Sequence, residues 1–112
     1  MRLPSPTFLA GVLACAALLA APSAQAGDPQ AGRKKARTCQ TCHGIDGASK
    51  LAEAPNLSGQ VETYLVKALH DFKSGARKNE MMTLVTEQLS DDDIADLAAW
   101  YSSVEITVTK PQ

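Results

Sequence analysis

The stretch Cys39-Gln40-Thr41-Cys42-His43 decides how the rest of this 112-residue chain is interpreted. The spacing Cys-x-x-Cys-His is the attachment signature of a c-type haem. Residues three apart on a helical turn share a face, so the Cys39 and Cys42 sulfurs can both reach the vinyl groups of one porphyrin. His43 follows directly and can direct its imidazole at the iron. The motif therefore predicts one covalently bound haem c, a cofactor that handles electrons.

The N-terminal residues have the pattern of a secretory signal peptide. Arg2 supplies positive charge, residues 8–21 form an apolar run, and Ala24-Gln25-Ala26 is a small-x-small sequence that a signal peptidase accepts. The apolar run is shorter than the roughly 20 residues that a membrane-spanning helix needs. We expect cleavage after Ala26, which divides the chain into a removed signal peptide at 1–26 and a periplasmic domain at 27–112.

The remaining segment is short and poor in large apolar side chains. Its aromatic residues are Tyr64, Phe72, Trp100 and Tyr101, and the loss of Cys15 with the leader leaves too few cysteines for a disulfide framework. A domain this small is marginal on a hydrophobic core alone, so we expect a buried haem to complete the core. The chain carries 11 basic and 12 acidic side chains, which argues against nucleic acid as a partner.

Three segments have helical patterns and none has a convincing strand pattern, so we expect an all-α domain. Asp28-Pro29 is typical of an N-cap followed by proline in the first turn, and it begins a helix that runs into the cysteine motif. A second helix begins near Gln60 and ends at Ser74-Gly75. A third is capped by Ser90, opens with three aspartates and reaches Val104. Apolar residues recur at three- and four-residue steps in the second helix: Val61, Tyr64, Leu65, Ala68, Leu69 and Phe72.

Two connecting segments lack a helical pattern. Residues 44–59 are rich in glycine, proline and small polar side chains, which predicts a loop that wraps the cofactor. Residues 76–89 are predicted as a second loop, and they contain Met81 and Met82, the only methionines after Met1. One of the two is a candidate for the sixth iron ligand. The alternative is that both are flexible core side chains.

These features together resemble the bacterial class I cytochromes c. The shared features are Cys-x-x-Cys-His after a short helix, the stretch Pro55-Asn56-Leu57-Ser58-Gly59-Gln60, a methionine-bearing segment and a final helix that begins Leu-Ser-Asp. The similarity covers essentially all of residues 27–112 and is greatest to short monohaem periplasmic members and to one half of the dihaem cytochromes. It implies the class I cytochrome c fold, in which three or more helices surround one covalently bound haem.

The resemblance also implies roles for single residues. The first and last helices of the family cross near the haem, which would place Gly32 against Trp100 and Tyr101. The proline after the haem-binding loop accepts a hydrogen bond from the ligand histidine through its carbonyl, so Pro55 would fix the tautomer and orientation of His43.

The sixth ligand follows from the same comparison. The family's methionine lies seven residues before the leucine of the Leu-Ser-Asp sequence, which is Met82, with Met81 as the alternative. A haem ligated by His43 and Met82 has no open position for oxygen or peroxide, and the thioether favours reduced iron. The resemblance therefore implies a periplasmic single-electron carrier, not an enzyme and without a small-molecule substrate. The alternative is a haem enzyme, or the cytochrome subunit of an oxidoreductase complex, with an open or labile sixth position.

The expected partners are redox proteins that dock transiently, with a membrane complex as one option, and we expect a monomer. Basic side chains around the motif would steer acidic partners, although most charge runs simply solvate a surface. These residues are Arg33, Lys34, Lys35, Arg37, Lys50, Arg77 and Lys78.

Two other assignments of the ligand-type residues are weaker, and a zinc site is opposed by the direct succession of Cys42 and His43, which leaves too little chain for both to bend round one ion. His70 could replace methionine as the sixth ligand, although its place off the apolar stripe favours the surface. The set Cys39, Cys42, His43 and His70 also has the ligand count of a zinc site.

Overall fold

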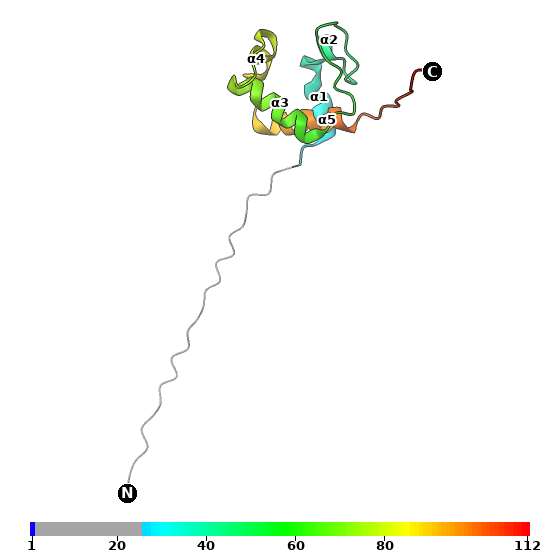
Figure 1. The fold of residues 1–112 in the computed structure, drawn as a ribbon. Helices are drawn as coiled ribbons and strands as arrows, with labels where there is room; N and C mark the ends of the chain where they lie inside the picture. The colour runs from blue at the N-terminus through cyan, green and yellow to red at the C-terminus, as the bar shows by residue number, and fades with distance from the viewer. Residues whose placement is uncertain (2–25) are drawn as a thin grey trace.

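The computed structural model describes Met1 and residues 26–112, and this part of the chain is all-α, as predicted (Figure 1). Its helices are α1 (Pro29–Lys35), α2 (Gln40–His43), α3 (Glu62–Ser74), α4 (Glu80–Thr86) and α5 (Asp91–Ser103), with a short 3₁₀ turn, η1 (Ala36–Thr38), between α1 and α2. No strand occurs in the described residues. None of their helices is both long and apolar enough to cross a bilayer. The expected signal peptide falls almost entirely on residues 2–25, outside the described residues, so it stays a prediction.

Helix α1 begins where the sequence predicts. The Asp28 carboxylate accepts a hydrogen bond of 2.8 Å from the Gln30 amide, and Pro29 occupies the first helical position. The prediction that this helix runs unbroken into the cysteine motif is wrong, because α1 ends at Lys35 and the chain tightens into η1. The Thr38 hydroxyl donates to the Lys35 carbonyl at 3.0 Å, which satisfies an acceptor that a continuing helix would have used.

The crossing of α1 and α5 is the closest helix contact of this fold. Gly32 is buried, and a Cβ placed on it would lie 1.9 Å from the Asp96 carbonyl oxygen and 2.8 Å from the Trp100 Cβ. The predicted juxtaposition of Gly32 with Trp100 is therefore present, together with the Asp96 backbone. Tyr101 instead faces the loop that follows His43. Only glycine lets two helix backbones approach this closely.

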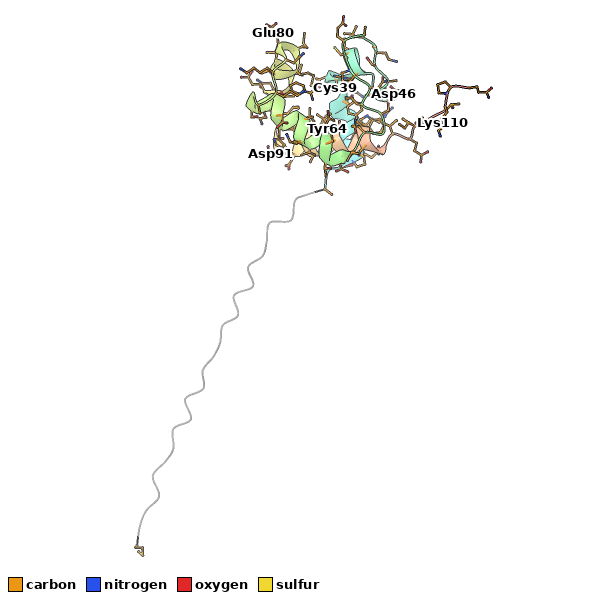
Figure 2. All side chains as sticks on the ribbon, in the orientation of Figure 1. Cys39, Asp46, Tyr64, Glu80, Asp91 and Lys110 are labelled. Atoms are coloured by element: carbon orange, nitrogen blue, oxygen red, sulfur yellow. The ribbon has the colours of Figure 1, made fainter. Side chains whose placement is uncertain are left out.

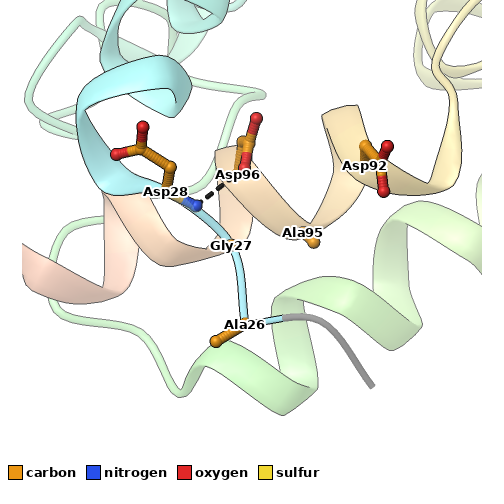
Figure 3. Close-up of a pocket in the computed structure, with 6 residues that line it drawn as sticks. All are labelled: Ala26, Gly27, Asp28, Asp92, Ala95 and Asp96. Atoms are coloured by element: carbon orange, nitrogen blue, oxygen red, sulfur yellow. Dashed lines mark hydrogen bonds between the residues drawn. The ribbon is translucent and has the colours of Figure 1, made fainter. Parts of the chain in front are cut away.

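Charged groups join the same two helices. The Lys35 ammonium lies 2.7 Å from an Asp93 carboxylate oxygen and 2.5 Å from Asp96, and Asp96 also accepts a 2.7 Å hydrogen bond from the Asp28 amide (Figure 3). The hydrogen bonds that Lys35 donates to Asp93 and then to Asp96 raise the pKa of Lys35 to about 12, and the bond from Lys35 lowers the pKa of Asp93 to about 2. Lys35 is therefore engaged inside the fold, which removes it from the predicted docking charges.

Helices α3 and α5 complete the core. The predicted capping box of α5 is present: the Ser90 hydroxyl accepts from the Asp93 amide at 3.1 Å, and the Asp93 carboxylate accepts from the Ser90 amide at 2.9 Å. On α3 the predicted apolar stripe is only partly buried, because Val61 and Tyr64 are exposed. The central cluster of buried side chains combines α3, α5 and η1: Ala36, Leu65, Leu97, Ala98 and Tyr101.

The prediction of a loop at residues 76–89 is wrong at the centre of this segment, where the chain forms helix α4. The Asn79 side chain caps α4 by accepting a 2.9 Å hydrogen bond from the Met82 amide, and α4 packs against α3. Its buried residue is Thr86. A short helix with a single buried side chain has too little apolar periodicity to be detected in the sequence.

Candidate haem site

The two cysteines and the histidine of the motif lie on one helical turn. Cys39 caps α2, while Cys42 and His43 belong to it, and the His43 amide donates to the Cys39 carbonyl at 2.9 Å. Both cysteines are free thiols and half-buried, and burial raises the pKa of Cys39. The turn therefore presents two reduced sulfurs and one imidazole from five consecutive residues, as the sequence predicts.

The His43 ring is held by the contact that the resemblance implied. Its Nδ1 lies 2.8 Å from the Pro55 carbonyl oxygen, and the residue is 8% exposed. A carbonyl can only accept, so Nδ1 carries the proton and Nε2 is the ring nitrogen that remains for a metal. Pro55 thus fixes both the tautomer and the rotation of the imidazole.

The loop after the motif is folded back on itself, which explains how Pro55 reaches His43. The amides of Lys50 and Leu57 donate at 2.8 Å to the carbonyls of Cys42 and Gly47. Gly47 has a φ of +83°, and a Cβ there would lie 2.4 Å from the Ser58 amide nitrogen. The predicted wrapping loop is thus a defined structure whose tight turn requires glycine.

Two aromatic residues of α5 anchor the start of this loop. The Trp100 indole donates to the Ile45 carbonyl at 2.7 Å, and the Tyr101 hydroxyl donates to the buried Gly44 carbonyl at 3.1 Å. Burial, followed by the nearby Cys39, raises the pKa of Tyr101, which keeps its hydroxyl protonated as a donor. The sequence predicted Trp100 and Tyr101 at the helix crossing but did not predict their hydrogen bonds to the loop. The available signal was that buried tryptophan and tyrosine need polar partners.

The methionines lie on α4, which stands apart from the α2 segment above helices α3 and α5 in the view of Figure 1. Helix α4 and the α2 segment rise on different sides of a base formed by α1, α3 and α5 (Figure 1), and Glu80 and Cys39 mark these two sides in Figure 2. The two methionine side chains differ in exposure: Met82 is half-buried, whereas Met81 is 61% exposed.

A zinc site finds no support in the described residues, where no three side chains of His, Cys, Asp or Glu are grouped to hold a metal ion. His70 lies on α3 and is half-buried rather than fully exposed. The thiols and imidazole of α2 suit a haem better than a bare ion, because the sulfurs bind the porphyrin and only His43 binds the metal.

Comparison with known proteins agrees with this geometry. The profile of the family "Cytochrome c" matches residues 29–105, which is more than half of the chain. The chain belongs to the cytochrome c family. Proteins of this family carry covalently bound haem c and transfer single electrons, so haem c is the cofactor of this cytochrome.

Two relatives and one crystal structure show the extent of the similarity. This cytochrome is 47% identical over 83 residues to cytochrome c4 of Pseudomonas aeruginosa (74% of this chain, 41% of the relative). It is also 47% identical over 83 residues to cytochrome c-554(548) of Halomonas halodenitrificans (71% and 100%). The structure of reduced recombinant cytochrome c4 from Pseudomonas stutzeri superimposes with a TM-score of 0.69 at 42% identity (74% and 48%). The chain thus spans about half of the c4 proteins but all of c-554(548), which confirms the class I fold.

Proposed function

We propose that this cytochrome is a periplasmic single-electron carrier, with Cys39 and Cys42 bonded to one haem c and with His43 and Met82 as the axial iron ligands. The observation that carries the proposal is the hydrogen bond between His43 Nδ1 and the Pro55 carbonyl, because it leaves Nε2 as the metal-binding atom beside two free thiols. The haem, when bound, supplies iron that changes oxidation state by one electron.

The protein's own contribution is to hold its ligands in one arrangement. Pro55 fixes the imidazole of His43. Trp100 and Tyr101 of α5 donate hydrogen bonds to the carbonyls of Ile45 and Gly44, the two residues that follow His43. A ligand set held by buried hydrogen bonds changes little between oxidation states, which favours fast electron exchange. A filled sixth position also argues for a carrier without a substrate of its own.

The choice of Met82 over Met81 is supported by burial. Met82 is half-buried, while Met81 on the same short helix is 61% exposed. We expect Met82→Ala to abolish the far-red charge-transfer band of the ferric protein and to lower its reduction potential, because a soft thioether stabilises ferrous iron. Met81→Ala is the matched control and should keep both properties. A band that survives Met82→Ala would refute the ligand assignment.

Three of the basic side chains expected to steer partners lie together around one hollow. Arg33, Lys34 and Arg37 line a shallow hollow together with Gln40 of the haem motif and Ile45, and the Arg33 guanidinium lies over the Trp100 ring at 5.7 Å. These three cations support transient docking of acidic redox proteins, with association that weakens as salt increases.

Small redox reagents test this face without a known partner. We expect an Arg33→Gln and Arg37→Gln double variant to slow oxidation by anionic ferricyanide at low salt, while oxidation by a cationic cobalt phenanthroline complex is not slowed. Lys67→Gln, on α3, is a control that removes one positive charge elsewhere on the surface. Equal slowing with both reagents would indicate a change in the haem site rather than in docking.

Rapid carbon monoxide binding by the ferrous protein would instead favour an enzyme with a labile sixth position.

A further inference from the structure

Side-chain hydrogen bonds hold the Met82 backbone at both its amide nitrogen and its carbonyl oxygen. The Asn79 side-chain oxygen accepts from the Met82 amide at 2.9 Å. The Thr86 hydroxyl donates to the Met82 carbonyl oxygen at 2.8 Å and lies 3.2 Å from the Thr83 carbonyl oxygen. The two contacts tie Met82 to the start of the helix and to its end.

Helix α4 depends on such contacts more than its neighbours do. It has 7 residues, whereas α3 and α5 have 13 each. Isolated helices of fewer than about 12 residues are marginal in water, so the cap and the buried anchor decide whether a helix this short persists. Thr86 is the anchor, since it is the buried residue of α4 and is 0% exposed.

Each contact controls a different part of the Met82 position. Asn79 caps the helix three residues before Met82 and holds the Met82 amide in the first turn of α4. Thr86 lies one helical turn after Met82 and is buried. Because its hydroxyl is bonded to the Met82 carbonyl, it limits how far the Met82 backbone can move away from the core. Neither side chain is a candidate iron ligand.

We propose that Asn79 and Thr86 are positioning residues that hold Met82 in place as the sixth iron ligand. The inference rests on the proposed function, in which Met82 ligates the iron. Loss of either contact leaves the cysteine motif and His43 untouched, because both contacts lie within α4. The loss raises the fraction of molecules in which α4 has opened and the sixth position can accept another ligand.

Imidazole titration of the ferric holoprotein measures this opening directly, with the far-red methionine band as the signal. Removal of an N-cap shifts a helix equilibrium by roughly fivefold, so we expect Asn79→Ala to bind imidazole about five times more tightly. Asn79→Asp keeps a capping oxygen and should restore the wild-type affinity. We expect Thr86→Val, which keeps the shape but removes the hydroxyl, to bind imidazole about three times more tightly. Thr86→Ser should reverse part of that change.

A cap on another helix separates ligand positioning from general stability. Ser90→Ala removes the corresponding contact at the start of α5, where the Ser90 hydroxyl accepts from the Asp93 amide. We expect this variant to unfold at lower denaturant concentration but to bind imidazole with wild-type affinity. If Ser90→Ala tightens imidazole binding as much as Asn79→Ala does, the effect is global and the inference is wrong.

Two further results would overturn the inference, and they differ in what else they refute. Wild-type imidazole affinity in both Asn79→Ala and Thr86→Val, with the band lost in Met82→Ala, would refute positioning but keep the ligand assignment. A band that persists in Met82→Ala would refute the ligand assignment and the inference together.

Discussion

The crossing of α1 and α5 is packed backbone against backbone, whereas α4 is attached to the rest of the domain through its packing on α3 and one buried side chain. At the crossing, Gly32 leaves no room for a methyl group and Lys35 bridges two carboxylates of α5. On α4, only Thr86 is buried, and Met81 and Leu84 are more than 60% exposed. We expect the crossing to contribute most to the stability of the fold, whereas α4 carries the proposed ligand Met82.

This difference implies that the two regions can be disrupted separately. Changes at the crossing should lower the free energy of unfolding and leave the iron ligands unaltered in the molecules that fold. Changes in α4 should alter the ligands and leave most of the unfolding free energy in place.

Gly32→Ala should have the largest effect. The new Cβ would lie 1.9 Å from the Asp96 carbonyl oxygen, a backbone atom that cannot move without separating the helices. We expect a loss of about 3 kcal/mol in unfolding free energy, measured by denaturant titration of the holoprotein. Gly75→Ala is the control: Gly75 has a φ of +80° but open space around it, so it should lose only about 1 kcal/mol. Equal losses would contradict close packing as the cause.

Tyr101→Phe should have an intermediate effect. It removes the hydroxyl that donates to the buried Gly44 carbonyl, which then keeps only the 3.2 Å hydrogen bond from the Gly47 amide. We expect a loss of about 1.5 kcal/mol in unfolding free energy, the upper end of the usual contribution of one hydrogen bond, because this one is buried. The far-red band should be unchanged, since α4 is not involved. A lost band with unchanged stability would show that Tyr101 acts on the ligands instead.

Lys35→Met should have the smallest effect, and one that depends on pH. The pKa of Asp93 is lowered from 3.8 to about 2, so its contribution is present above pH 3.8 and is lost as the pH falls towards 2. The pKa of Lys35 is raised from 10.5 to about 12, so its contribution is present below pH 10.5 and is lost as the pH rises towards 12.

We therefore expect the wild type to be more stable than Lys35→Met by about 1 kcal/mol between these limits, with the difference shrinking outside them. Thermal melts across the pH range measure it. Lys67→Met removes the exposed pair with Asp71 on α3 and should change the melting temperature little at any pH. A pH-independent difference for Lys35→Met would mean that packing, not charge, links the two helices.

The sequence predicted the features that depend on neighbouring residues. The turn of Cys39 to His43, the Asp28 cap and the capping box of Ser90 are each determined within four residues, so their patterns are visible without a fold. The Gly32 crossing and the Pro55 contact followed from the family resemblance. Neither could have been derived from periodicity, because each joins segments distant in the chain.

The features that the sequence did not predict depend on tertiary context. Helix α4 has no apolar stripe of its own and persists through its Asn79 cap and its packing on α3. In the sequence Lys35 is one of several neighbouring basic residues. Its ion pairs with Asp93 and Asp96 form only because α5 packs against α1.

The spacing of these contacts along the chain also bears on the order of assembly. His43 and Pro55 are 12 residues apart, whereas the hydrogen bonds from α5 to α1, Gly44 and Ile45 join residues separated by 55 to 68 positions. Short loops close at lower entropic cost, so the segment with the cysteines can take shape before the C-terminal helix arrives. Since Cys39 packs against a core to which α5 contributes Leu97, Ala98 and Tyr101, we expect its sulfur to be more exposed before α5 docks than in the folded domain.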